Sequence, residues 1–196
     1  MTIAIIGGTG GFGKGLAERL RRLGEDVLVG SRSPRDDIVS NEEAARRADT
    51  VFLSVPPDGV ESTARALAEA LAGKIVVSVA SPVTFRDGRP SANPSDRSLA
   101  EIAAAAAPEA RVVAGFHTVA ARALKVDAPI DEDVLLCADD AEAKAAVAEL
   151  AERLVEGRAV DCGRLESARW LETLTTLLLN INRNYKSETG VRITGL

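Results

Sequence analysis

A glycine-rich turn directly after a short apolar run constrains the fold of this chain most strongly. The run, TIAIIG at 2–7, is rich in β-branched residues and is expected to form a strand buried on both faces. Gly8, Gly10 and Gly13 then match the pattern G-x-G-x-x-G, and a helical pattern begins at the last of them. Because the glycines lie between an expected strand and an expected helix, they predict a dinucleotide-binding turn.

Each glycine of this pattern has a separate physical role. The first allows a tight turn, the second lets the backbone approach a pyrophosphate, and the third lets helix and strand pack closely. The helix that follows directs free N–H groups and the positive end of its dipole toward the anion. A tight corner without any ligand is the alternative interpretation.

The end of the second expected strand, 26–31, indicates which dinucleotide binds. A site for NAD places an acidic residue there, about 20 residues after the glycines, to hold the ribose 2′-hydroxyl. This chain instead has Ser31 and Arg32, followed by Arg35. A hydroxyl and planar guanidinium groups suit a 2′-phosphate, and no carboxylate repels it. The segment therefore predicts NADP(H) rather than NAD, unless these arginines only face solvent.

Strand-like and helix-like segments alternate along the whole chain. This alternation is typical of a doubly wound, mostly parallel α/β sheet of the Rossmann type, with a small C-terminal helical element. Strands are expected at 2–7, 26–31, 50–56, 74–81, 110–117, 133–138 and 157–163. Helices are expected at 13–24, 40–48, 59–71, 99–108, 141–154 and 166–184. We expect an NADP-binding domain over 1–162 and a C-terminal segment over 163–196, for dimerisation and completion of the site. A long loop is expected over 82–98.

Composition excludes several classes of protein. The net charge of −5 and the 3% of aromatic residues argue against a nucleic-acid partner. No apolar run reaches the roughly 18 residues that span a membrane, and no signal peptide is expected. Cys137 and Cys162 lack the spacing of a metal site, so we expect two small buried residues in a reduced, cytoplasmic protein. Asp139 and Asp140 precede a helix, where a cap is the simpler interpretation than a catalytic pair.

The single histidine, His117, ends the fifth expected strand. Ligands of a doubly wound sheet bind at the carboxyl ends of its strands, so a ligand contact and a purely structural role both remain open for His117. The same two interpretations hold for Thr118 and for Ser81, which ends the fourth strand. No catalytic residue and no metal ligand is expected among them.

Six segments in order resemble one known family, the NADPH-dependent reductases of coenzyme F420, an 8-hydroxy-5-deazaflavin. The segments are GGTGGFGKGLA, VGSR, KIVVS, FHTVAARAL, LLCADD and SARWLETLTTLLLNI. The resemblance covers nearly the whole chain and implies hydride transfer between NADP(H) and F420 in a homodimer. We expect the segment TLTTLLLNI to form the dimer core rather than a cofactor contact.

The resemblance also implies which residues hold the nicotinamide dinucleotide. Its pyrophosphate is wrapped by Thr9, Gly10, Gly11 and Phe12. The 2′-phosphate is held by Ser31 and Arg32, with Arg35 replacing a basic residue that the family has next to this pair.

The resemblance implies a second set of contacts around the two reacting rings. Pro57, Ser81 and Ala121 line the nicotinamide, and His117 and Val119 border the deazaflavin. The two cofactors carry the hydride chemistry themselves. An NADPH-dependent reductase of another acceptor (a flavin, a ferric complex or an imine) is one alternative, and a non-catalytic NADPH-sensing protein is another.

Overall fold

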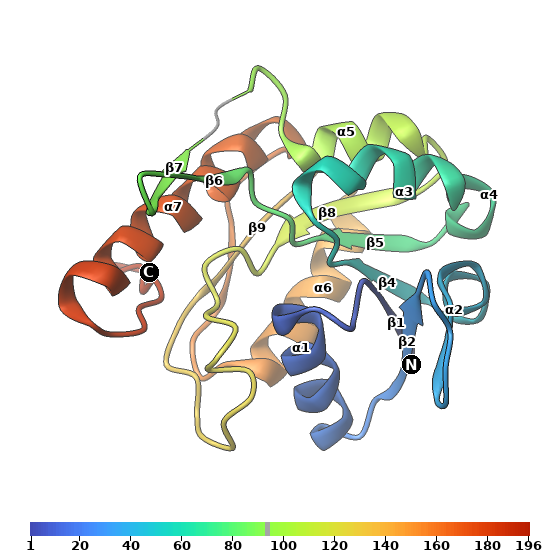
Figure 1. The fold of residues 1–196 in the computed structure, drawn as a ribbon, viewed down its shortest axis with the longest axis horizontal. Helices are drawn as coiled ribbons and strands as arrows, with labels where there is room; N and C mark the ends of the chain where they lie inside the picture. The colour runs from blue at the N-terminus through green and yellow to red at the C-terminus, as the bar shows by residue number, and fades with distance from the viewer. Residues whose placement is uncertain (93–94) are drawn as a thin grey trace.

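A twisted sheet forms the centre of the protein. The computed structural model describes residues 1–92 and 95–196. Within these residues, eight strands make one sheet in the order β10-β9-β8-β5-β4-β1-β2-β3, with helices on both faces (Figure 1). The strands are β1 (Thr2–Ile6), β2 (Asp26–Ser31), β3 (Ile38–Ser40), β4 (Thr50–Leu53), β5 (Ile75–Ser78), β8 (Arg111–Gly115), β9 (Val134–Ala138) and β10 (Ala159–Asp161). Neighbouring strands are parallel except β8 and β9, so the predicted doubly wound, mostly parallel Rossmann-type sheet is confirmed.

Helices cover the two faces of the sheet in separate groups. They are α1 (Gly11–Arg22), α2 (Asn41–Arg47), α3 (Val60–Ala66), α4 (Ala68–Leu71), α5 (Leu99–Ala106), α6 (Ala141–Leu154) and α7 (Ala168–Tyr185), with the 3-10 turns η1 (Pro57–Gly59) and η2 (Leu165–Ser167). Side chains alternate along β1: Ile3 and Ile5 pack with α1 and α6, whereas Ala4 and Ile6 pack with α2, α3 and α5. Burial on both faces explains why the strands are nearly continuous apolar runs.

Acidic residues after β9 attach neighbouring elements to the sheet. Asp140 precedes α6, and its carboxylate accepts a hydrogen bond from the Ala143 amide at 2.8 Å. The predicted capping role is therefore confirmed for this residue. Asp139 does not cap the helix but pairs with the Arg164 guanidinium at 3.0 Å, which holds the start of η2 against β9.

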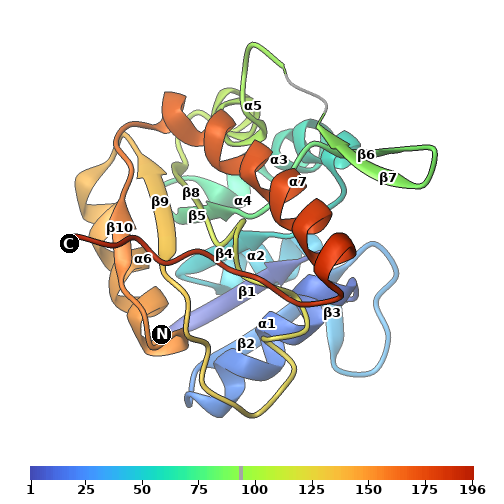
Figure 2. The same ribbon diagram turned by 90° about the vertical axis from the view of Figure 1, so that its left-hand side faces the viewer.

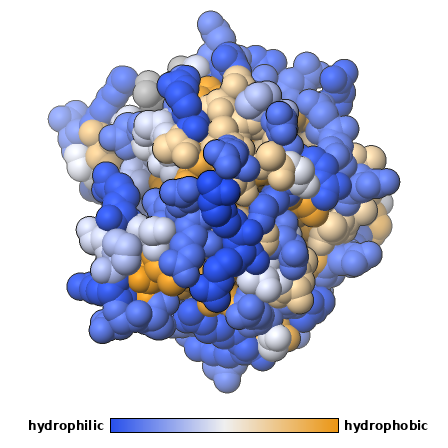
Figure 3. Space-filling model, turned by 90° about the vertical axis from the view of Figure 1, so that its right-hand side faces the viewer, coloured by the Kyte–Doolittle hydropathy of each residue, from blue (hydrophilic) through white to orange (hydrophobic). Residues whose placement is uncertain are grey.

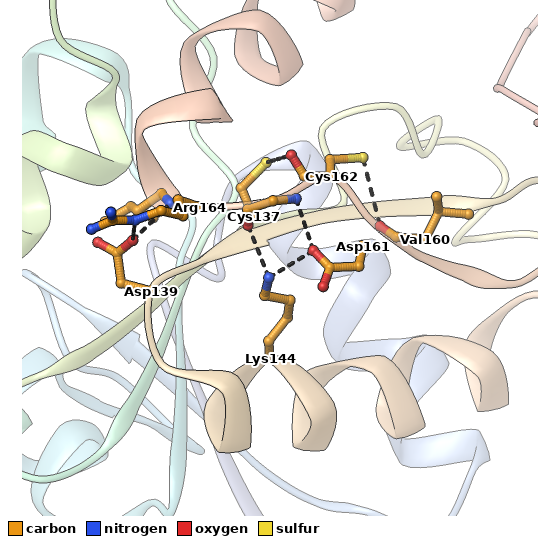
Figure 4. Close-up of polar contacts among 9 residues, drawn as sticks. Cys137, Asp139, Lys144, Val160, Asp161, Cys162 and Arg164 are labelled. Atoms are coloured by element: carbon orange, nitrogen blue, oxygen red, sulfur yellow. Dashed lines mark hydrogen bonds and ion pairs between the residues drawn. The ribbon is translucent and has the colours of Figure 1, made fainter.

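Further polar contacts near the end of β9 hold β10 in place (Figure 4). Lys144 of α6 donates to the Asp161 carboxylate at 2.6 Å and to the Gly163 carbonyl at 2.9 Å. Cys137 is buried, and its thiol donates to the Cys162 carbonyl at 3.8 Å. Both cysteines are free, and the expectation of two buried residues is confirmed for Cys137, whereas Cys162 is only half-buried.

The expectation of a long loop over 82–98 is wrong for its first half. Val83–Arg86 (β6) and Arg89–Ala92 (β7) form an antiparallel hairpin. Its two turn residues, Asp87 and Gly88, both have positive φ, at 49° and 67°. Such a two-residue turn favours Asp-Gly because both central residues must be left-handed. The Asp-Gly pair was therefore a sequence signal for a hairpin that the sequence analysis missed. Positions 93–94 of the expected loop lie outside the described residues.

The C-terminal segment packs against the rest of the chain at several places. Leu165, Ala168 and Leu171 belong to the same hydrophobic cluster as α3 and α5. After α7 the chain runs back across the molecule toward β10 (Figure 2). There the buried Asp133 accepts a hydrogen bond from the Ile193 amide at 2.7 Å. This amide holds the pKa of the Asp133 carboxyl below its usual value.

Candidate functional site

The glycine-rich turn lies where the order of the strands reverses. Strand β1 has β2 on one side and β4 on the other, so the connections on its two sides leave in opposite directions. The turn follows β1 and leads into α1 at Gly11. In open α/β sheets, ligands bind in the crevice at this point.

Glycines of the turn have two different surroundings. A Cβ at Gly8 would lie 2.9 Å from Val29 Cγ1, and one at Gly13 would lie 2.8 Å from the Gly8 Cα. These two positions therefore allow the close packing of helix and strand. A Cβ at Gly10 would meet only a carbonyl oxygen at 3.4 Å, and at Gly11 nothing lies within 4 Å. The backbone of Gly10 and Gly11 thus faces open space, as a pyrophosphate cradle requires.

A cleft of about 1260 Å³ extends from this turn along the carboxyl ends of β1, β2, β4, β5 and β8 to α7. Its volume exceeds the roughly 300–1,000 Å³ of a typical small-ligand site. Most of the residues predicted for the site line it: Thr9, Gly10, Gly11, Phe12, Ser31, Arg32, Ser81, His117, Val119 and Ala121. Residues from four separate parts of the sequence are thus brought together.

Four predicted residues lie outside the wall of this cleft. Gly8 and Gly13 lie behind the turn, where they pack as described above. Arg35 lies in the loop after β2, and its backbone pairs with that of Ile38. Pro57 begins η1 and lines a second cavity of about 620 Å³, between the hairpin, α5 and α7.

One end of the cleft offers basic and polar groups at the carboxyl end of β2. Ser31 Oγ accepts a hydrogen bond from the Ser33 amide at 3.1 Å, which keeps the loop turned at this point. Arg32 is exposed at the cleft and forms no hydrogen bond or ion pair within residues 1–92 and 95–196. Its guanidinium donors are therefore available to an anion. Asn41, which the sequence analysis missed, also lines this end, and its Oδ1 has no partner in the described chain.

At the other end, the chain turns sharply after β8. Phe116 is buried with a φ of 65°, a conformation that costs energy for any residue except glycine. It is held by Phe52, whose ring meets it edge-on with centroids 5.5 Å apart. This turn places His117 and Thr118 on the cleft wall. Strain of this kind is tolerated where the surrounding structure requires one geometry.

His117 and Thr118 line the cleft and carry buried polar atoms without hydrogen-bond partners in the described chain. Neither ring nitrogen of His117 nor the Thr118 hydroxyl has a hydrogen-bond partner among the described residues. Burial lowers the pKa of His117 to about 4, so the imidazole is neutral near pH 7. Buried polar groups are normally paired, so two unpaired ones beside a cleft favour the ligand-contact interpretation over a satisfied structural histidine.

Helix α7 closes this end of the cleft. The Thr175 hydroxyl donates to the His117 carbonyl at 2.9 Å. It lies 2.8 Å from Ser81 Oγ, and because its one proton is already used, Ser81 is the donor in this second bond. Leu178 and Leu179 add apolar wall to the same end.

The prediction that TLTTLLLNI forms the dimer core rather than a cofactor contact stays a prediction, but one side of this segment lines the cleft. Thr175, Leu178 and Leu179 line the cleft, whereas Leu177 and Ile181 point outward. A helix that separates two surfaces produces this pattern, because residues three and four apart share a face.

Comparison with known proteins identifies the family. Residues 2–82 match the family described as NADP oxidoreductase, coenzyme F420-dependent. The F420-dependent NADP reductase of Methanocaldococcus jannaschii is 39% identical, over 100% of this chain and 99% of that protein. The chain belongs to the F420-dependent NADP oxidoreductase family. A solved structure from Arthrobacter sp. FB24, proposed to be an F420-dependent NADP reductase, superposes with a TM-score of 0.88 at 30% identity, covering 99% of both chains.

This F420-dependent oxidoreductase also resembles part of a larger protein. Rat metalloreductase STEAP3 is 34% identical over 88% of this chain, which corresponds to 36% of that protein.

The residues of the oxidoreductase fit both cofactors that its family uses. The open backbone at Gly10 and Gly11 and the unpaired Arg32 fit a phosphorylated dinucleotide. At the far end, the unpaired His117 and Thr118 fit the polar edge of a ring system, with the apolar α7 wall beside it. Among the described residues, no group of three His, Cys, Asp or Glu could hold a metal ion, and no helix is long and apolar enough to cross a membrane.

Sequence reasoning missed several residues of this cleft. They are Asn41, Thr63, Thr175, Leu178 and Asn182. The threonines within the apolar pattern of α7 could have indicated that one side of the helix meets a polar surface. No sequence signal marks Asn41, since a residue in the first turn of a helix is commonly polar.

Proposed function

We propose that this chain transfers a hydride between NADP(H) and coenzyme F420, with both held in the one cleft. The observation that carries the proposal is the continuity of the cleft, from the open glycine backbone and Arg32 to the unpaired His117 and Thr118. The F420-dependent NADP reductases to which the chain is similar along its full length support it. The reaction needs two flat rings face to face, and the volume of about 1260 Å³ gives room for two ligands.

In this proposal, residues near β1 and β2 hold the dinucleotide. The pyrophosphate is cradled by Thr9, Gly10, Gly11 and Phe12, while Gly8 and Gly13 let α1 approach. The 2′-phosphate is held by Ser31 and Arg32, and Arg35 joins them if its loop moves toward the cleft.

The reacting rings lie at the other end of the cleft. Ser81 and Ala121 border the nicotinamide, and His117 and Val119 border the deazaflavin. Pro57, which the sequence also indicates for the nicotinamide, begins η1 and reaches this ring only if η1 shifts toward the cleft. The two cofactors supply the hydride chemistry when bound. The protein orients the rings and excludes water, which is where its contribution to the rate comes from. His117 is neutral near pH 7, so it offers one ring N–H and one acceptor nitrogen without adding a charge.

The direct test mixes enzyme, NADPH and oxidised F420 and follows the visible absorbance of the deazaflavin. Loss of that absorbance at a rate proportional to enzyme supports the proposal. Turnover only with a ferric complex, a flavin or an imine would replace F420 with another acceptor. NADPH binding without turnover of any acceptor would indicate a sensor protein. Mass spectrometry of ligand retained on purification would identify the dinucleotide independently.

Arg32→Ala tests the dinucleotide preference. We expect its affinity for NADPH to fall about 10- to 100-fold, because one or two charge-assisted hydrogen bonds to the 2′-phosphate are lost. Affinity for NADH should not change. Calorimetric titration of both nucleotides measures the difference. Arg47→Ala is the matched control, since this exposed arginine pairs with Glu43 at 3.0 Å and lies outside the cleft. An equal loss for NADH would mean that Arg32 does not read the 2′-phosphate.

We also propose that the chain forms a homodimer through the outward face of α7, in the segment 163–196. Trp170, Leu177, Ile181 and Tyr185 are 70%, 60%, 40% and 78% exposed and follow one another at helical spacing. Such a row of apolar side chains on one helix face is typical of an interface. By contrast, the side of the molecule where α2 and α4 lie is mostly hydrophilic, so it offers a less apolar surface for association (Figure 3).

Replacing Leu177 and Ile181 together by glutamate should convert the dimer to a monomer, because buried carboxylates without partners oppose association. Size-exclusion chromatography with light scattering measures the mass. Val126→Glu, at a residue 48% exposed in another region, is the control and should leave the mass unchanged. A dimer that survives the double substitution would place the interface elsewhere.

We further propose that the protein is cytoplasmic. Its two free cysteines fit a reducing compartment.

A further inference from the structure

Glu172 is a buried carboxylate that joins two helices far apart in the sequence. It lies on α7 and is 1% exposed. Its two oxygens accept hydrogen bonds from the amides of Leu99 and Ala100, at 2.9 and 3.0 Å. These amides open α5, so the charge lies at the positive end of that helix.

Glu172 completes the hydrogen bonding at this helix end. A helix leaves its first amides without internal partners. At α5, Ser98 and Glu101 form a capping box that satisfies their own two amides, at 2.7 and 3.0 Å. Glu172 takes the two between them, so each amide from 98 to 101 has a partner. Because Ser98 and Glu101 already cap α5 locally, the main effect of the Glu172 carboxylate is to hold α7 against α5.

The helix face that carries Glu172 leads directly to the cleft. Thr175 follows three residues later, on the same side of α7. Its hydroxyl bonds to the His117 carbonyl and receives a bond from Ser81. An unbroken series of contacts therefore runs from the α5 end, through α7, to the strained turn at Phe116 and His117.

We propose that Glu172 is a positioning residue: it anchors α7 on α5 so that Thr175 holds the His117 turn at the deazaflavin end of the cleft. This inference rests on the proposed function. No residue of α7 contacts the glycine-rich turn or Arg32 through a hydrogen bond in the described chain, so the effect should fall on one cofactor. Burial raises the pKa of Glu172 to about 7, whereas the Leu99 and Ala100 amides act in the opposite direction, because they favour the ionised carboxylate.

The test compares Glu172→Ala with Glu101→Gln in the full-length chain. Glu101→Gln removes a charge from the same end of α5 but keeps the capping acceptor, and only Glu172→Ala removes the link to α7. We expect Glu172→Ala to lower kcat/KM for F420 about 10-fold or more, with NADPH affinity within about twofold of the wild type. Glu172→Gln, which keeps one acceptor oxygen, should recover part of the loss. Glu101→Gln should leave kcat/KM for F420 close to the wild-type value. An equal effect of Glu101→Gln, or an equal loss for NADPH, would overturn the proposal.

A second measurement does not depend on activity. Because the chain has a single histidine, the carbon-bound ring protons of His117 can be assigned directly in NMR, and their shift with pH gives its pKa. In Glu172→Ala its pKa should rise from about 4 toward 6.5 as the turn loosens, and in Glu101→Gln it should not. If F420 is not a substrate but this shift occurs, only the proposed function fails. An unchanged His117 signal in a folded Glu172→Ala overturns the positioning role.

Thr175→Val keeps the test decisive if Glu172→Ala does not fold. It removes the hydroxyl contacts to His117 and Ser81 and leaves the anchor on α5 intact. It should reproduce the His117 shift, and the total shift in the double variant Thr175→Val/Glu172→Gln should be smaller than the sum of the two single effects. Fully additive shifts would mean that Glu172 and Thr175 act separately, which contradicts the proposal.

Discussion

Replacing Gly10 by valine is expected to lower the affinity for NADPH at least about 100-fold while the protein stays folded. Gly10 has φ −74° and ψ 167°, which a β-branched residue adopts readily. A Cβ there would meet only the Gly7 carbonyl, at 3.4 Å, so the free energy of unfolding should change by about 1 kcal/mol or less. The added side chain would occupy the space in which the backbone approaches the pyrophosphate, and the charge-assisted hydrogen bonds to that group would be lost.

Calorimetric titration with NADPH and urea unfolding of the same sample measure the two effects separately. Gly10→Ala serves as the graded control, with a smaller loss of affinity in the same direction. A valine variant that binds NADPH as tightly as the wild type would show that the pyrophosphate does not lie against this turn.

Replacing Gly7 by alanine should have the opposite result, a large loss of stability. Gly7 has φ +80°, and a Cβ there would collide with the carbonyl oxygen of Ser54 at the end of β4. We expect the free energy of unfolding to fall by about 3 kcal/mol or more, because the strained backbone and the collision add together.

Gly24→Ala is the matched control for Gly7→Ala. Gly24 has nearly the same φ, +83°, but nothing lies within 4 Å of its added Cβ. Its substitution should cost only about 1–2 kcal/mol, the penalty of the left-handed conformation. Urea unfolding of both variants measures the difference, which isolates the close approach of the turn to β4. Equal losses would mean that the turn relaxes away from Ser54.

Local signals predicted the fold, and most of the residues that they indicate for the dinucleotide line one cleft. The alternation of strands and helices and the glycine pattern each depend on a few consecutive residues, so they can be read from the chain directly. The structure places Thr9, Ser31 and Arg32 along the same wall, because β1 and β2 are neighbouring parallel strands. Their carboxyl ends necessarily meet at one edge of the sheet.

The hairpin at β6 and β7 shows that a local signal can also be missed. Its Asp-Gly turn was visible in the sequence, but the prolines around it favoured a loop. Pro90 is accommodated because β6 and β7 form a two-stranded sheet, in which each strand is an edge. The Pro90 carbonyl then accepts a hydrogen bond from Asn180 of α7 at 3.0 Å, which ties the hairpin to the cleft wall.

The sequence by itself determined the Rossmann-type sheet and the glycine-rich turn, and it predicted a 2′-phosphate contact at Ser31 and Arg32, since these features depend on neighbours along the chain. Only the tertiary structure decided how the end of the cleft beside α7 is built. Thr175 meets Ser81 across 94 residues, and Glu172 meets Leu99 across 73. Whether His117 is paired or unpaired likewise depends on which side chains pack around it. Contacts of this kind follow from the docking of α7 on the core, a packing event for which no short stretch of sequence carries a signal.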